Sequence, residues 1–87
     1  MDSNIKLMLF QDKIMDKVFD ILTGRGIHLE LQWNGDVILE ITLEDKGKQG
    51  LAIDLLRKSK MAQSFSVAGV TSGDGGPQII VQFDNIG

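Results

Sequence analysis

Apolar side chains recur at helical spacing near the start of the chain. The residues just before them, Asp2, Ser3 and Asn4, are all favourable at a helix N-cap. This pattern predicts a helix over residues 4–23, which Gly24 and Gly26 would end. The apolar positions of the helix are Leu7, Phe10, Ile14, Val18 and Ile21.

The apolar arc of this helix is wider than contact with one sheet requires. Further apolar residues extend it to about half of the helix circumference, and Ile5 and Leu9 lie outside it. An acidic row on the opposite side is typical of a solvated face. We therefore expect the flank of the helix either to lie in a crevice or to meet a partner. The extending residues are Met8, Met15, Phe19 and Leu22, and the acidic residues are Asp12, Asp16 and Asp20.

Two alternating runs follow, over residues 27–33 and 37–43, and Asn34-Gly35 lies between them. Alternation of apolar and polar residues on both sides of an Asn-Gly pair predicts a β-hairpin. A two-residue loop would place the apolar side of one strand beside the polar side of the other. We therefore expect a three-residue loop with a bulge at Gly35.

This three-residue loop determines which side chains of the hairpin face each other. Leu31 would lie opposite Val37, and His28 would lie opposite Glu40 on the polar face. Trp33 would lie at the hairpin tip, where its burial within one chain is incomplete.

A second helix and a second hairpin are predicted in the rest of the chain. The helix covers residues 51–60, and a glycine-rich loop over 71–77 joins strands at 64–70 and 78–84. Because residues 79–83 are apolar on both faces, we expect that strand to be central or covered by another subunit. The order αββαββ predicts an α+β two-layer sandwich. Its two helices pack on one face of a four-stranded, mainly antiparallel sheet.

Length and composition indicate a single small domain over residues 1–87 and argue against an enzyme. The chain has 87 residues, no cysteine and one histidine, which excludes disulfides, thiol catalysis and thiolate metal sites. A chain of this size has little room for an internal cleft. His28, Glu30 and Glu40 would lie on an open sheet face that excludes no water. We expect no catalytic residues, no metal site and no cofactor.

The charge is mildly acidic and unevenly distributed. The net charge is −3, with nine acids and four bases in residues 1–45 against three acids and five bases in residues 46–87. Its sign and size do not suit a nucleic-acid partner. The longest apolar run, Leu7–Phe10, is far shorter than the ~20 residues that cross a bilayer. We expect a cytoplasmic protein with neither a nucleic-acid nor a membrane partner.

Apolar residues at exposed positions are the main indication of function. Met8 and Phe19 widen the helix arc, Trp33 lies at a hairpin tip, and Ile38 interrupts a polar strand face. On a small chain such residues suggest a contact surface. The leading hypothesis is a non-enzymatic protein-interaction module, homo-oligomeric and acting as an inhibitor, adaptor or regulator. By fold-level analogy, this class includes phage-encoded inhibitors of host defence proteins.

An anionic metabolite or nucleotide is the alternative partner. Successive amides of a glycine-rich loop can form a concave anion site, and cations at the end of the second helix would add charge. The loop matches neither the phosphate-binding Lys-Ser/Thr motif nor the dinucleotide fingerprint. The residues assigned to this site are Arg57, Lys58, Lys60, Ser72, Gly73, Gly75 and Gly76.

Overall fold

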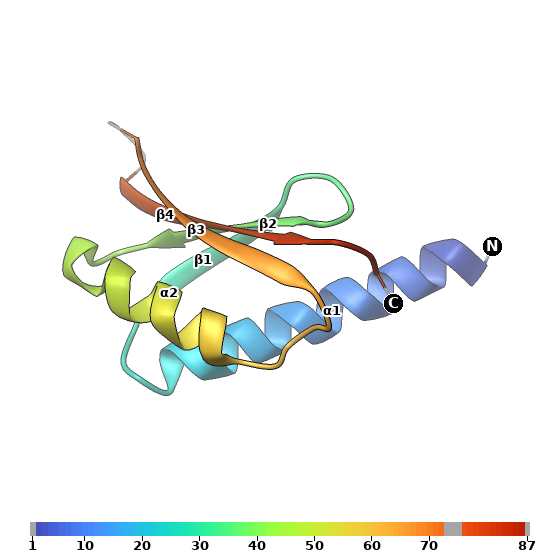
Figure 1. Ribbon diagram of the computed structural model, residues 1–87, viewed down its shortest axis with the longest axis horizontal. Coiled ribbons are helices and arrows are strands. Elements are labelled where there is room, and N and C mark those ends of the chain that lie inside the picture. Colours follow the sequence, from blue (N-terminus) through green and yellow to red (C-terminus); the bar gives the residue numbers. More distant parts are fainter. Residues whose placement is uncertain (1, 73–75, 87) are drawn as a thin grey trace.

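The structure is a computed structural model that describes residues 2–72 and 76–86. Within these residues, two helices pack on one face of a four-stranded antiparallel sheet (Figure 1). The predicted α+β sandwich and its αββαββ order are confirmed. The elements are α1 (Asp2–Thr23), β1 (Leu29–Trp33), β2 (Ile38–Leu43), the short 3-10 helix η1 (Lys46–Lys48), α2 (Gln49–Lys58), β3 (Phe65–Ser72) and β4 (Gly76–Phe83).

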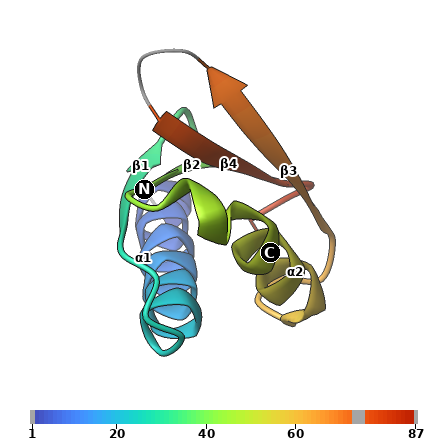
Figure 2. The same cartoon turned by 90° about the vertical axis from the view of Figure 1, so that its left-hand side faces the viewer.

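The strand order is β1-β2-β4-β3, with every neighbouring pair antiparallel. The prediction that the apolar last strand is central is confirmed, because β4 lies between β2 and β3. Figure 2 shows α1 beneath the β1 side of the sheet and α2 beneath the β3 side. The order leaves β1 and β3 as the two edge strands.

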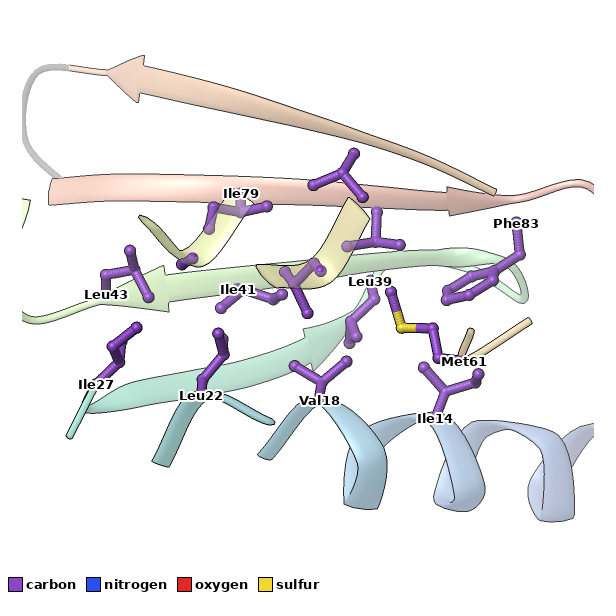
Figure 3. Close-up of a cluster of buried hydrophobic side chains, with 14 residues drawn as sticks. Ile14, Val18, Leu22, Ile27, Leu39, Ile41, Leu43, Met61, Ile79 and Phe83 are labelled. Atoms are coloured by element: carbon purple, nitrogen blue, oxygen red, sulfur yellow. The ribbon is translucent and has the colours of Figure 1, made fainter. Parts of the chain in front are cut away.

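The core lies between the sheet and the two helices (Figure 3). Alternation along β2 and β4 directs every second side chain into it. At the end nearest the chain termini, the Phe83 ring meets Phe10 edge-on at 5.3 Å and lies 6.0 Å from Trp33. The buried residues are Ile14, Val18, Leu22, Ile27, Leu39, Ile41, Leu43, Ala52, Leu56, Met61, Val67, Ile79, Val81 and Phe83.

The predicted register of the first hairpin is wrong. Leu31 lies opposite Ile41 rather than Val37, because residues 34–37 form a longer loop in which Gly35 has a φ of 83°. The shift is even, so each side chain keeps its predicted face. Trp33 is consequently a strand residue opposite Leu39, not a residue of the hairpin tip.

The same shift separates His28 from Glu40. Glu40 lies opposite Gln32, and the backbone N–H of Glu44 donates to the carbonyl oxygen of His28. The expectation that His28 and Glu40 face each other across the hairpin is therefore wrong.

The second hairpin is longer than predicted. Its ladder continues to Thr71 opposite Pro77 and Ser72 opposite Gly76, both of which the sequence placed in a loop. The side chains of α2 lie close to this hairpin at Gly69, where a Cβ atom would lie 2.8 Å from Ile53 Cδ1 and would displace it.

Candidate functional site

The N-terminal end of α1 extends past the strands (Figure 1), and several of its apolar side chains are exposed. Phe10 is the first residue of α1 that packs against the described core. Before it, Ile5, Met8 and Leu9 are 56%, 63% and 64% exposed. Because they are spaced three and four residues apart, they lie on one side of the helix. These three residues are called the α1 tip.

Two of the four residues that the sequence assigned to a partner contact lie on the exposed side of α1. Met8 belongs to the α1 tip, and Phe19 is 51% exposed. They are separated by about three helical turns, so they share one side of α1 at a distance of about 16 Å. Sequence reasoning placed Ile5 and Leu9 outside the buried arc but did not assign them to the contact. Their spacing with Met8, three and one residues along the helix, is the sequence feature that could have identified them.

The other two residues, Trp33 and Ile38, lie elsewhere. Trp33 packs against Phe10 and Phe83 on the helix-covered face of the sheet. Ile38 is half-buried on the opposite face, where it pairs with Gln82 of β4. The four residues therefore do not form one surface. Among the described residues, four of the six exposed large apolar side chains lie on α1, and the other two are Leu51 and Val70.

A groove runs between α1 and residues 59–63, and it consists of adjoining hollows of about 590 and 290 Å³. A further hollow of about 590 Å³ lies between residues 57–64 and β3, and Lys60 lines all three hollows. Apolar side chains from both sides line the hollow beside α1: Phe10, Ile14, Met61 and Ala62.

Four cations border the two larger hollows. Lys13 and Lys17 are one turn apart on α1, Arg57 belongs to α2, and Lys60 follows α2. Among the described residues, no carboxylate lines these two hollows, whereas Asp20 lines the smallest. Within residues 2–72 and 76–86, Lys13, Lys17 and Lys60 form no ion pair. The groove beside α1, called the cationic groove and defined by Lys13, Lys17 and Lys60, therefore favours an anionic group, and Arg57 borders the neighbouring hollow beside β3.

The glycine-rich loop is only partly described. Gly73 and Gly75 lie outside the described residues, while Ser72 and Gly76 form the last pair of the β3–β4 ladder. The end of α2 that lies toward this pair is its first residue, Gln49. The Gln49 side-chain amide donates to backbone carbonyls of both strands, two residues from the Ser72–Gly76 pair.

The basic end of α2 lies away from Ser72 and Gly76, so the expectation that it adds charge there is wrong. The Arg57 guanidinium donates to the carbonyl oxygen of Val67, which is about 16 Å along β3 from Ser72. Lys58 pairs with Asp54 on the surface of α2, at 3.1 Å. An anion site at the loop would need the basic C-terminal end of α2 beside it, but the N-terminal end of α2 lies toward the loop instead.

A search of residues 2–72 and 76–86 finds no group of three His, Cys, Asp or Glu side chains placed to hold a metal ion. In the same residues no helix combines the length and apolar character needed to span a membrane.

Comparison of the chain with protein-family models, with curated proteins and with solved structures gives no match. The described features of the chain that bear on function are the α1 tip, the cationic groove and the sheet edges.

Proposed function

We propose that this domain is a non-enzymatic protein-interaction module, an inhibitor, adaptor or regulator that binds another protein chain with the exposed side of α1. The proposal rests on one observation. Ile5, Met8 and Leu9 are each more than half exposed on a helix end that precedes the first core residue of α1.

The α1 tip has a clear energetic reason to bind. Burying an exposed aliphatic side chain is favourable by about 1.5–3 kcal/mol when burial is complete. Three such side chains on one side of a helix supply a compact apolar anchor of the kind that dominates protein interfaces. Since the tip lies outside the described core, the fold gains little from these side chains. Phe19 extends the same side of α1 toward its C-terminal half.

The experiment replaces the α1 tip with Ile5→Gln, Met8→Gln and Leu9→Gln together. Glutamine is a good helix former, so α1 should persist and the melting temperature should stay within a few degrees of the original. Lysate of the source cells is passed over immobilised original and variant domains. We expect proteins that bind the original domain to be lost from the variant.

A matched control is Lys46→Gln, which changes an exposed side chain far from α1 in sequence. It should retain every protein that the original domain binds. The proposal is contradicted if the tip variant retains the same proteins. It is also contradicted if the tip variant unfolds, because the three side chains would then serve the fold.

Binding of an anionic small molecule is a second candidate function, and the cationic groove favours it. The sequence assigned Arg57, Lys58 and Lys60 to an anion site at the glycine-rich loop. Of these, Lys60 lines the cationic groove together with Lys13 and Lys17 from α1. An apolar floor beside uncompensated lysines suits a ligand with an anionic group and a hydrophobic portion. Two kinds of ligand test these features. Inorganic pyrophosphate and a nucleotide panel test binding of an anionic group by the lysines, and a medium-chain fatty acid also tests contact with the apolar floor.

For this candidate, the melting temperature should rise with the ligand in the original protein and not in a Lys13→Ala/Lys17→Ala variant. Lys46→Ala, which removes a lysine outside the groove, should keep the rise. No shift with any of these ligands, or an equal shift in all three proteins, would exclude the groove as an anion site.

A further inference from the structure

The edge strand β3 lacks the features that usually protect an exposed sheet edge. Edge strands are commonly short, charged, interrupted by a bulge or broken by proline. β3 is eight residues long, FSVAGVTS, with no charged residue and no proline. Its pairing with β4 is unbroken from Phe65 to Ser72. The opposite edge, β1, has five residues and includes Glu30.

The hydrogen-bonding groups of alternate β3 residues face away from the sheet. The N–H of Asp84 donates to the carbonyl of Ser64, so the even-numbered residues of β3 are those that bond to β4. The backbone groups of Phe65, Val67 and Gly69 therefore point outward. Figure 2 shows β3 at the margin of the sheet, and no other described helix or strand pairs with this side.

One outward group of β3 has a partner in the chain. Arg57 Nη2 donates to the carbonyl oxygen of Val67 at 2.8 Å. A carbonyl oxygen has two lone pairs, so this contact leaves room for a backbone N–H in the plane of the sheet. The outward N–H groups have no such partner in the described part of the chain.

The side chains of β3 suit pairing with an identical strand. Ser66, Ala68 and Val70 lie on the open face of the sheet, opposite the helices, and are exposed and small. A twofold axis places a strand antiparallel to its own copy, so that the residue on the axis faces itself and the residues on either side of the axis face each other. A charged side chain of the strand near the axis would then lie close to a like charge, and β3 itself has no charged residue.

We propose that β3 pairs with β3 of a second copy of this chain, antiparallel about a twofold axis, and joins two sheets into one. The inference deepens the proposed protein-interaction function by naming one partner, but it uses a surface separate from the α1 tip. The outward groups of Phe65, Val67 and Gly69 supply the new backbone hydrogen bonds. The open-face side chains of Ser66, Ala68 and Val70 supply the cross-strand contacts.

Charge placed on β3 tests this arrangement. Light scattering across a range of concentrations should give twice the chain mass for the original protein. Ala68→Lys and Ala68→Glu should each give the mass of one chain, because the two like charges would lie close together beside the axis. An equimolar mixture of the two variants should return to twice the chain mass. The matched control, Gln32→Lys, adds the same charge to the open face at the other edge strand and should leave the dimer intact.

Three results would overturn the pairing: a single-chain mass for the original protein at all concentrations, a dimer that persists in both Ala68 variants, or a mixture that stays monomeric. If Ala68→Lys fails to fold, amide hydrogen exchange of the original dimer tests the strand pairing instead. The N–H groups of Val67 and Gly69 should exchange at least tenfold more slowly in the dimer than after dilution to the monomer. Equal exchange rates would refute the pairing of β3 with β3. The α1 tip variant should remain dimeric, so loss of the dimer in that variant alone would instead assign self-association to α1.

Discussion

The side-chain amide of Gln49 donates to the carbonyl oxygen of Gln78 at 2.8 Å, which joins the first turn of α2 to the central strand β4. A longer contact of the same nitrogen, 3.3 Å, reaches the carbonyl of Val70 in β3. Val70 and Gln78 are direct partners in the β3–β4 ladder. One side chain therefore fixes the start of α2 over both strands of the second hairpin.

Gln49→Ala removes both contacts and should lower the free energy of unfolding by about 1–2 kcal/mol, since each net hydrogen bond contributes roughly 0.5–1.5 kcal/mol. Urea unfolding monitored by circular dichroism measures this change in the free energy of unfolding. Gln63→Ala, which truncates an exposed glutamine outside this contact, should change the same quantity by less than about 0.5 kcal/mol. Equal effects of the two substitutions would contradict a positioning role for Gln49.

Local patterns were sufficient to predict the elements and the layer architecture of this chain. The helix that ends before Gly24 and the central position of the last strand both follow from periodicity and from residues near in sequence. The register of the first hairpin does not follow from these patterns, because shifting one strand by an even number of residues leaves every side chain on the same face of the sheet. In the structure Trp33 packs against both Phe10 and Phe83, and those contacts involve residues distant in the chain.

The candidate site was predictable only in part for the same reason. Met8 and Phe19 are exposed as expected, because their exposure depends on the helical period alone. The cationic groove combines Lys13 and Lys17 with Lys60, which lie more than forty residues apart. Only the path of the chain brings them together, and the direction of α2 also separates its basic end from the glycine-rich loop.

Adjacent cations at the end of α2 should differ in their contribution to stability. Arg57 donates to the Val67 carbonyl in a partly buried contact, whereas Lys58 pairs with Asp54 on the surface. Arg57→Ala should cost about 1 kcal/mol or more, and Lys58→Ala less than about 0.5 kcal/mol. Both residues lie in the last helical turn, so their effects on the helix dipole are similar. Urea unfolding of the two variants measures the difference, and a larger loss for Lys58→Ala would contradict the assignment.

Two glycine substitutions should change stability in opposite directions. Gly50 lies in α2, and a Cβ atom there meets nothing within 4 Å. Gly50→Ala should therefore raise the free energy of unfolding, by up to about 1 kcal/mol. Gly35 has a φ of 83° in the first hairpin loop, where Ala should cost about 1–2 kcal/mol. Thermal unfolding of both variants measures these opposite changes in stability. A Gly35→Ala variant that is more stable than the original protein would refute the loop conformation.

Phe83 should contribute far more to stability than the equally large Phe19. Phe83 is 1% exposed and contacts the rings of Phe10, Trp33 and Phe65, so Phe83→Ala should cost about 3–5 kcal/mol. Phe19 is 51% exposed, and Phe19→Ala should cost less than about 0.5 kcal/mol. Trp33 is the single tryptophan of the chain, and its fluorescence reports on this cluster directly. Its emission in the folded state should move to longer wavelength in Phe83→Ala and stay unchanged in Phe19→Ala. A shift in Phe19→Ala, or none in Phe83→Ala, would contradict the placement of Trp33 beside Phe83.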